Sequence, residues 1–377
     1  MQLGIDISTF DELAELNPVY RYHGQVIEPL SFFRQHSGIS LVRIRIWNDP
    51  FDEKGRPYGG GTTDLAAFLR SAKKAQSLGY GILLDFHYSD FWADPGKQTT
   101  PKAWTGKSYP EVVKALYEYT RDTLLTVKRE GIALAGIQVG NEITHGMVWP
   151  YGALDREFDP ETGGGFEGLS GLLKAGVAAC REVYPEAKVL LHLEHSGSYE
   201  MQEPWLYNVT KNGVDFDVIG QSYYPFWHGS LEGFRYNNER LQKEYGKPVW
   251  VVELGYAFGS SPYEEEHKDL TNLIDDNFVA TTPSDRVPFP LTKQGQADYL
   301  RAFLGVAKSI GVEAVFYWEP MWIGIEGAGW AKQAGMEYTG EVGKPALNEW
   351  ANETLFDFEG EATPGLDSFT QSVVDSL

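Results

Sequence analysis

Two glutamates, Glu142 and Glu253, each end a short apolar run and bring the residue type needed for acid–base chemistry on a sugar. Glu142 closes segment 138–142 and Glu253 closes segment 249–253. Cleavage of a glycosidic bond requires one carboxyl group that protonates the leaving oxygen and a second, ionised one that meets the positive charge developing at the anomeric carbon. The pair therefore predicts glycoside cleavage, provided that the fold brings the two strand ends together.

Two arginines, Arg43 and Arg45, alternate within segment 42–47 and so point to the same face of that strand. An arginine inside a closed fold must be paired, and we expect Glu253 to be the partner of Arg45, which would hold that glutamate ionised. The alternative is that both arginines pair with core acids and only stabilise the fold. Asp6 and Asp85 are rival carboxylates, each able to support one of the arginines instead of acting on a substrate.

Other nucleophiles and metal sites have less support in the sequence. No Gly-x-Ser-x-Gly motif occurs, and Cys180, the single cysteine, lies in a helical apolar stripe, where we expect a buried hydrophobic residue. His87 has no second histidine at ligand spacing, while His192 and His195 could form half of a metal site. We expect His87 to form hydrogen bonds with a sugar, and we expect no catalytic metal.

Eight short apolar runs alternate with amphipathic segments along the chain. The runs are residues 3–7, 41–47, 81–86, 137–140, 189–193, 218–221, 249–253 and 314–318. Such runs indicate parallel strands covered on both faces, and their alternation with helices predicts a single (β/α)8 TIM barrel with long βα loops. An open doubly wound sheet is the alternative, but it would carry a glycine-rich loop after the first strand, where this chain has Ser8 and Thr9. In a barrel, both glutamates stand at the carboxyl ends of strands, where active sites form.

Length and charge limit the organisation of the chain and its partners. Of the 377 residues, we expect 1–350 to form the catalytic barrel and 351–377 an acidic C-terminal extension, partly ordered or packed on the barrel. The 53 acidic and 32 basic residues give a net charge of −21, which repels nucleic acids, anionic membranes and polyanionic sugars. We therefore expect a neutral substrate and no nucleic-acid or membrane partner, while the oligomeric state stays open.

The start of the chain leaves its localisation open. Residues from Met1 onward already read as a strand, without the basic and apolar regions of an export signal. The protein is cytoplasmic if Met1 is native, and extracellular if an export signal was removed.

Four long segments at the strand ends carry distinctive motifs. They are His-Tyr-Ser-Asp-Phe-Trp-Ala-Asp-Pro-Gly-Lys-Gln at 87–98, Gln-Val-Gly-Asn-Glu at 138–142, Ser-Tyr-Tyr-Pro-Phe-Trp-His-Gly at 222–229 and Phe-Tyr-Trp-Glu-Pro at 316–320. These motifs resemble those of one known family, glycoside hydrolase family 53, the endo-β-1,4-galactanases. The resemblance runs from about residue 3 to residue 325, and motifs of this length rarely arise by chance.

The resemblance implies a retaining (β/α)8 enzyme that cleaves internal β-1,4 bonds of galactan or arabinogalactan, with Glu142 as acid/base and Glu253 as nucleophile. Retention predicts carboxyl groups about 5–5.5 Å apart. On this basis we expect Asn141 to bind the sugar 2-hydroxyl, three tryptophans to stack on sugar rings, and Tyr223 or Tyr224 to steady the nucleophile. The full set of expected substrate-binding residues is Arg45, Asp85, His87, Trp92, Asn141, Tyr223, Tyr224, Trp227 and Trp318.

Two departures from the family pattern bear on the site. Many relatives have Glu-Thr-Ser-Tyr at the nucleophile, where this chain has Glu253-Leu254-Gly255-Tyr256, so a subsite is expected to be reshaped. Some bacterial relatives bind a structural calcium after the seventh strand, but the acidic residues of 262–269 do not reproduce the ligand spacing. We therefore expect no required cofactor, and structural calcium is not favoured.

Two other functions remain open at this point. A barrel hydrolase acting on another neutral β-1,4-glycan, such as glucan or mannan, would carry the same pair of glutamates, because a fold does not fix its substrate. A non-catalytic glycan-binding barrel would be expected to lack one of the carboxylates or the paired arginine, and this chain has them all. The expected substrate is neutral β-galactan or a galacto-oligosaccharide.

Overall fold

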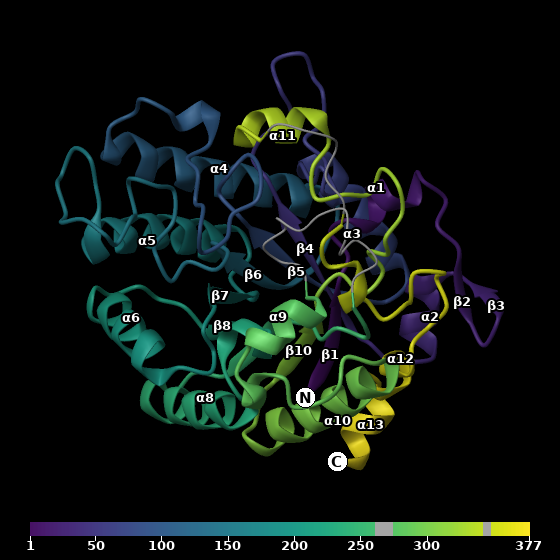
Figure 1. The fold of residues 1–377 in the computed structure, drawn as a ribbon. Helices are drawn as coiled ribbons and strands as arrows, with labels where there is room; N and C mark the ends of the chain where they lie inside the picture. The colour runs from purple at the N-terminus through teal and green to yellow at the C-terminus, as the bar shows by residue number, and fades with distance from the viewer. Residues whose placement is uncertain (261–273, 342–347) are drawn as a thin grey trace.

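The computed structural model describes residues 1–260, 274–341 and 348–377. Eight parallel strands close into a barrel in the order β1-β10-β9-β8-β7-β6-β5-β4 (Figure 1). The strands are β1 (Gln2–Asp6), β4 (Leu41–Ile46), β5 (Gly81–Phe86), β6 (Leu134–Val139), β7 (Lys188–Leu193), β8 (Val218–Tyr223), β9 (Val249–Leu254) and β10 (Ala314–Tyr317). Each of the eight strands predicted from the sequence is present, and the closed parallel barrel confirms the (β/α)8 fold.

The interior of the barrel is apolar at one end and charged at the other. A cluster of inward side chains fills the amino-terminal end, and it comprises Leu41, Leu83, Leu190, Val218, Trp250, Val252, Ala314 and Phe316. Gly4 completes this end, because a Cβ there would lie 2.3 Å from the Phe316 ring. The same inward register continues on β4 and β5 as Arg43, Arg45 and Asp85, which are all buried. The polar residues are therefore concentrated towards the carboxyl ends of the strands.

Helices surround the barrel and pack their apolar faces on the outer side of the strands (Figure 1). The longer ones are α3 (Leu65–Ser77), α4 (Tyr109–Arg129), α5 (Gly165–Val183), α6 (Tyr199–Lys211), α8 (Leu231–Tyr245) and α10 (Lys293–Ser309). Their ends follow local sequence signals: Ser108 and Glu111 form a capping box at the start of α4, and α8 stops at Gly246 in the left-handed conformation. None of the described helices is long and apolar enough to cross a membrane.

Shorter elements decorate the loops and the chain ends. The remaining α-helices are α1 (Phe10–Ala14), α2 (Pro29–Gln35), α7 (Pro225–His228), α9 (Asp276–Thr281), α11 (Gln333–Thr339), α12 (Pro364–Ser368) and α13 (Gln371–Ser376). Within the described ranges, 3-10 helices occur at η1 (Lys102–Trp104), η2 (Ser284–Arg286) and η3 (Ala351–Glu353). An antiparallel hairpin of β2 (Tyr20–Tyr22) and β3 (Gln25–Ile27) was not predicted.

The C-terminal segment 348–377 packs against the barrel, with α12 and α13 beside α10 (Figure 1). Gln296 of α10 donates a hydrogen bond to the Thr354 carbonyl at 2.9 Å and accepts one from the Thr363 hydroxyl at 2.7 Å. Leu355 and Phe369 are fully buried. This segment therefore contributes to the same core as the barrel helices.

Candidate active site

A cavity of about 710 Å³ opens at the carboxyl ends of the barrel strands. Its volume lies in the range of sites that bind small molecules or short oligomers. Both glutamates singled out by the sequence line it, together with aromatic and basic side chains. The residues used below that line it are Arg43, Arg45, His87, Trp92, Asn141, Glu142, Glu194, His195, Tyr224, Trp227, Glu253, Trp318, Trp330 and Trp350.

Glu142 and Glu253 face each other within this cavity. One carboxylate oxygen of each, and one ring nitrogen of His192, all lie within 4.8 Å of one another. Glu142 follows β6 in a left-handed conformation with φ of 48°, directly after Gly140 and Asn141, and this sharp turn lets its side chain leave the strand direction. The pairing register of β9 shifts against both of its neighbours near Glu253, an irregularity of the kind that re-aims a side chain.

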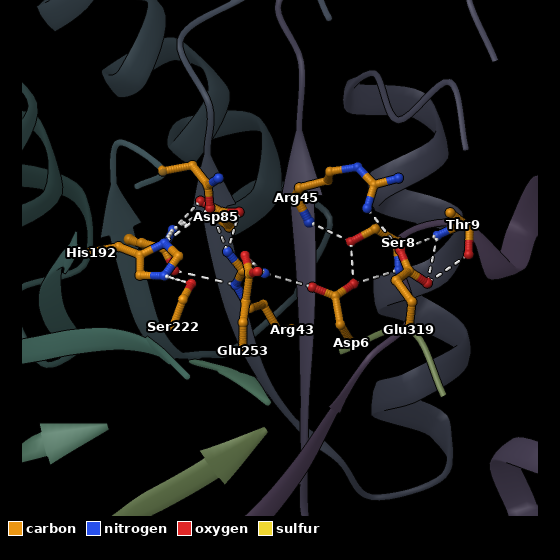
Figure 2. Close-up of polar contacts among 12 residues, drawn as sticks. Asp6, Ser8, Thr9, Arg43, Arg45, Asp85, His192, Ser222, Glu253 and Glu319 are labelled. Carbon is orange, nitrogen blue, oxygen red and sulfur yellow. Dashed lines mark hydrogen bonds and ion pairs between the residues drawn. The ribbon is translucent and has the colours of Figure 1, made fainter. Parts of the chain in front are cut away.

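Arg43 holds three carboxylates at the base of the cavity (Figure 2). Its guanidinium lies 2.8 Å from Asp6, 2.8 Å from Asp85 and 3.0 Å from Glu253. The sequence prediction that Arg45 pairs with Glu253 is therefore wrong. Arg45 lies two residues further along β4, towards the mouth, where it forms an ion pair with Glu319 at 2.7 Å and covers the Trp92 ring. Depth in the barrel, which sequence alternation does not report, decides which arginine meets Glu253.

The electrostatic surroundings of the two facing carboxyl groups give them different tendencies to hold a proton. Burial raises the pKa of Glu142 well above its usual range, and the charges of Glu253 and Glu194 raise it further. Burial also raises the pKa of Glu253, to about 7, but the Arg43 charge and the Tyr224 hydroxyl oppose that rise. Because Glu253 has an arginine and a hydroxyl donor, the proton shared by the pair resides on Glu142. The site thus presents one protonated and one ionised carboxyl group.

Two adjacent tyrosines point in opposite directions, as neighbours on a strand do. The Tyr224 hydroxyl donates a hydrogen bond to Glu253 Oε2 at 3.0 Å, and its ring lines the cavity. Tyr223 is fully buried on the outer side, where its hydroxyl donates to the Gly229 carbonyl and its ring packs on Phe234. The expected substrate contact of Tyr223 is therefore corrected: it is part of the core between the barrel and its helices.

Asp85, His87 and Asn141 form a connected polar layer. Asp85 is fully buried beneath the cavity and binds Arg43 and His87, so the structure makes it a support for these groups and corrects its expected contact with substrate. His87 Nε2 faces Asp85 at 3.1 Å, while Nδ1 accepts from the Trp47 indole. Asn141 accepts from Arg43 at 2.7 Å through Oδ1 and donates from Nδ2 to the Ala93 carbonyl. His87 and Asn141 do line the cavity.

Aromatic rings form one wall of the cavity. The three predicted tryptophans Trp92, Trp227 and Trp318 line it, and the structure adds Trp330 and Trp350, which sequence reasoning missed. The Trp92 and Trp318 ring centroids lie 6.4 Å apart, and those of Trp318 and Trp350 lie 5.4 Å apart. Trp350 directly precedes the acidic segment that was expected to be an extension. The only sequence feature that could have marked it as a cavity residue is that it is an aromatic residue in a stretch without a clear pattern.

The described residues contain one trio with metal-ligand geometry, Glu142, His192 and Glu253. Both ring nitrogens of His192 already have hydrogen-bond partners, Nδ1 with the Glu142 backbone and Nε2 with the Ser222 hydroxyl. His192 is therefore poorly suited to serve as a metal ligand, and the trio is more consistent with proton chemistry. The predicted absence of calcium at 262–269 concerns a loop that overlaps 261–273, outside the described residues.

An α/β barrel whose mouth holds two facing carboxyl groups, that of Glu253 buried and that of Glu142 partly buried, has the architecture of the barrel glycoside hydrolases. The family model for glycosyl hydrolase family 53 matches residues 2–369. An endo-beta-1,4-galactanase of Bacillus subtilis is 34% identical over 97% of this chain and 84% of its own length. The chain belongs to glycosyl hydrolase family 53 and is a glycosyl hydrolase, as its strand-end motifs indicated.

Solved structures agree with this assignment. The GH53 catalytic domain of Ignisphaera aggregans has a TM-score of 0.83 and 34% sequence identity, covering 97% of this chain and 94% of that chain. A structure of fungal beta-1,4-galactanases has a TM-score of 0.76 and 26% identity, covering 98% of each chain.

Proposed function

We propose that this protein hydrolyses internal β-1,4-galactosidic bonds of galactan or arabinogalactan with retention of anomeric configuration. The observation that carries the proposal is the facing of Glu142 and Glu253, with oxygens within 4.8 Å of each other. A short separation suits a nucleophilic carboxylate, because an inverting enzyme must leave room for a water molecule between sugar and base. The family relatives named endo-β-1,4-galactanases support galactan as the substrate.

In the first step, an Oε atom of Glu253 attacks the anomeric carbon and the bond from that carbon to O4 of the next galactose breaks. Glu142 transfers its proton to the departing O4, which leaves as a hydroxyl group. Arg43 and Tyr224 hold Glu253 in its ionised form before the attack. This step yields a glycosyl ester on Glu253 and an ionised Glu142.

In the second step, Glu142 takes a proton from a water molecule whose oxygen attacks the anomeric carbon. The ester bond breaks and Glu253 leaves as a carboxylate, so one water molecule is consumed and both glutamates regain their starting states. The scheme requires no cofactor.

The cavity also offers groups that bind the sugar. Asn141 uses one amide hydrogen on the Ala93 carbonyl, and we assign the other to the 2-hydroxyl, a contact that strengthens as the oxocarbenium-like transition state forms. We assign Trp92, Trp227 and Trp318 to stacking on sugar rings, with Arg45 as a hydrogen-bond donor in the same cavity. His87 lines the cavity, but its Nε2 faces Asp85 and its Nδ1 accepts from the Trp47 indole, so it supports the cavity and has no N–H left for the sugar.

The proposal is tested by measuring reducing ends released from pectic galactan, with mannan and cellulose as comparison substrates. We expect rapid release from galactan and a loss of at least about 10³-fold in both Glu142→Gln and Glu253→Gln. Proton NMR of the first product should show the β-anomer. Full activity of Glu253→Gln, or an α-anomer formed first, contradicts the mechanism, while preference for mannan or cellulose contradicts the substrate.

A further inference from the structure

The two facing glutamates divide the mouth of the barrel into two unequal sides. Glu142 follows β6 and Glu253 lies on β9, and the strand order places β7 and β8 between them on one side, the short arc (Figure 1). The other side, the long arc, holds β5, β4, β1 and β10. Since the bond to be cut lies between the two carboxyl groups, the two sugars that it joins lie over different arcs.

The two arcs present different side chains to the cavity. On the long arc, Trp92 follows β5 and Trp318 follows β10, and the Trp350 ring packs against both, with ring centroids 6.2 Å and 5.4 Å away. The cavity-lining residues that follow β7 and β8 combine polar groups with a tryptophan, and they include Glu194, His195 and Trp227. A sugar over the short arc therefore meets hydrogen-bonding groups as well as a ring.

Asn141 indicates which sugar lies over which arc. Its Nδ2 donates to the Ala93 carbonyl, after β5, and its Oδ1 accepts from Arg43 on β4, so the amide group is turned towards the long arc. In the proposed mechanism Asn141 binds the 2-hydroxyl of the sugar that Glu253 attacks, which places that sugar over the long arc. The galactose that departs with its O4 protonated by Glu142 then lies over the short arc.

His195 has a ring that is open to this part of the cavity. Its side chain is 29% exposed, whereas that of the preceding Glu194 is 1% exposed. The ring forms no hydrogen bond with the described residues, and Glu194 Oε1 lies 3.6 Å from Nε2, beyond hydrogen-bond range. His195 also has a φ of 61°, a left-handed backbone that is uncommon outside glycine and recurs at functional sites. Its ring nitrogens are therefore available to a ligand.

The residue before His195 is tied to the loop that carries Glu142. Thr144, two residues after Glu142, donates from its hydroxyl to Glu194 Oε2 at 2.8 Å. This bond connects the start of the loop after β7 with the loop after β6. His195 is therefore held beside the loop of the residue that protonates the departing O4.

Burial keeps the His195 ring neutral at neutral pH. It lowers the pKa of His195 below its usual value, and the positive charges of His145 and Arg286 lower that pKa further. A neutral imidazole has one N–H donor and one acceptor nitrogen, and a sugar hydroxyl both donates and accepts. The ring can therefore bind a hydroxyl in either tautomer.

We propose that His195 is a substrate-binding residue for the leaving galactose, and that its ring forms a hydrogen bond with a hydroxyl of that sugar. The proposal rests on the proposed function, since it needs Glu142 to protonate the departing O4. The sugar that becomes bound to Glu253 does not make this contact. His195 therefore governs which leaving groups the enzyme accepts and takes part in neither proton transfer.

The experiment compares two substrates that both place galactose over the long arc and differ in the group that leaves. One is β-1,4-galactan, and the other is 4-nitrophenyl β-1,4-galactobioside, whose leaving group carries no sugar hydroxyl. For His195→Ala we expect kcat/KM on galactan to fall about tenfold, the size of one hydrogen bond between neutral groups. On the aryl substrate, both kcat and kcat/KM should remain near the wild-type values.

The aryl substrate also shows whether the substitution acts through Glu142. Its good leaving group makes the second step limit kcat, and Glu142 is the base of that step. A substitution that disturbs Glu142 therefore lowers the aryl kcat, whereas loss of a contact with the leaving galactose does not. Normal aryl activity shows in addition that the variant is folded.

Three further variants isolate the nitrogen atoms of the ring. His195→Phe keeps the ring volume without the nitrogens and should lose galactan activity as His195→Ala does, which decides the question if the alanine variant does not fold. His195→Asn carries an amide nitrogen near the position of Nδ1 and tolerates the left-handed backbone, so it should recover most of the galactan activity. His145→Ala removes an exposed histidine that is not among the described residues lining the cavity, and it should leave both activities unchanged.

The outcomes separate this proposal from the proposed function. Unchanged galactan activity in His195→Ala, an equal loss on both substrates, or a His195→Asn variant as weak as His195→Ala overturns the role of His195 and leaves the mechanism standing. Full activity of Glu142→Gln overturns the mechanism and this proposal with it. If the enzyme prefers another β-glycan, the comparison is made with that glycan and its aryl glycoside, and it tests His195 in the same way.

Discussion

At the scale of single residues, Glu253 is held by two donors of different kinds. Arg43 contacts Oε1 at 3.0 Å and supplies a full charge that is shared with Asp6 and Asp85. The Tyr224 hydroxyl contacts Oε2 at 3.0 Å and supplies a dipole to Glu253. Because the arginine divides its charge among three carboxylates, the tyrosine should carry a measurable share of the stabilisation of ionised Glu253.

Tyr224→Phe removes this hydroxyl while keeping the ring. We expect kcat on galactan to fall by about 10- to 100-fold, the range for one hydrogen bond to a charged group. Burial raises the pKa of Glu253 to about 7 despite these donors, and activity requires the ionised form, so it is lost as pH falls through that pKa. Removing a donor raises this pKa further, and the acidic limb of kcat/KM should move to higher pH.

Tyr223→Phe is the matched control for this substitution. It removes the hydroxyl of the adjacent tyrosine, which binds the Gly229 carbonyl outside the cavity. We expect an unchanged pH profile and a small loss of stability. Equal effects of the two substitutions would contradict the assignment of Tyr224 to Glu253.

The sequence located the strand ends of the site better than the direction of each side chain. Glu142 and Glu253 were predicted because an apolar run that ends in a carboxylate can be recognised in the amino-acid sequence. The direction of the Glu253 side chain, and hence its partner Tyr224, was not predicted, because β9 carries one extra residue, Val252, between the partners of Gln221 and Ser222. A shift of one residue reverses which neighbour faces the interior.

At the scale of elements, the loop after β9 and the C-terminal turn η3 meet directly beneath the cavity. A Cβ on Gly255 would lie 2.8 Å from Tyr224 Cε1 and 2.9 Å from Glu353 Oε2. The Phe258 backbone N–H donates a hydrogen bond to the Asn352 carbonyl at 2.8 Å. Because it has no side chain, Gly255 therefore leaves room for both the Tyr224 ring and the Glu353 carboxyl group.

Gly255→Ala tests this close packing. The added methyl group must displace Tyr224 or Glu353, at a cost of about 1–3 kcal/mol for an overpacked core. We expect a lower melting temperature and, because the Tyr224 hydroxyl moves relative to Glu253, a fall in kcat of about tenfold. Circular dichroism melting and galactan assays measure the two effects.

Gly259→Ala is the control in the same loop, since a Cβ there meets nothing within 4 Å among the described residues and its φ is not in the left-handed region. It should leave both kcat and melting temperature nearly unchanged. If Gly255→Ala behaves in the same way, the packing described above does not restrain Tyr224.

The strands were predictable because each barrel strand is an apolar run covered on both faces. The β2–β3 hairpin was not, because three-residue strands carry too little periodicity and Val26 is exposed. The boundary expected at residue 350 followed from the acidic composition and weak patterning of the tail. Composition did not reveal that Trp350 lines the cavity or that Glu353 packs beside Gly255, because both are tertiary contacts.

At the scale of the whole molecule, a net charge of −21 accompanies several carboxyl groups that the fold buries. Glu319, for example, is 3% exposed and has Arg45 and Thr9 as partners. Glu353 is 4% exposed, and neither of its carboxylate oxygens has a hydrogen-bond partner within the described residues. Burial alone raises its pKa to about 8.

This raised pKa makes the stability of the protein depend on pH. Below the ordinary value of 4.5, Glu353 is protonated in both the folded and unfolded states and has no effect on the pH dependence. Between 4.5 and about 8, the unfolded chain ionises while the folded protein keeps the proton, so the free energy of unfolding falls as pH rises. Above that window the loss is complete and constant.

Glu353→Gln removes the ionisation while keeping the shape of the side chain. We expect the difference in free energy of unfolding between this variant and wild type to increase with pH. Measured with urea from pH 5 to pH 8, it should grow by about 1 kcal/mol per pH unit in favour of the variant and reach a few kcal/mol. Glu359→Gln, an exposed neighbour, should show no such growth with pH. A difference between Glu353→Gln and wild type that stays constant from pH 5 to pH 8 would mean that Glu353 finds a partner or water when ionised, and that its burial does not govern alkaline stability.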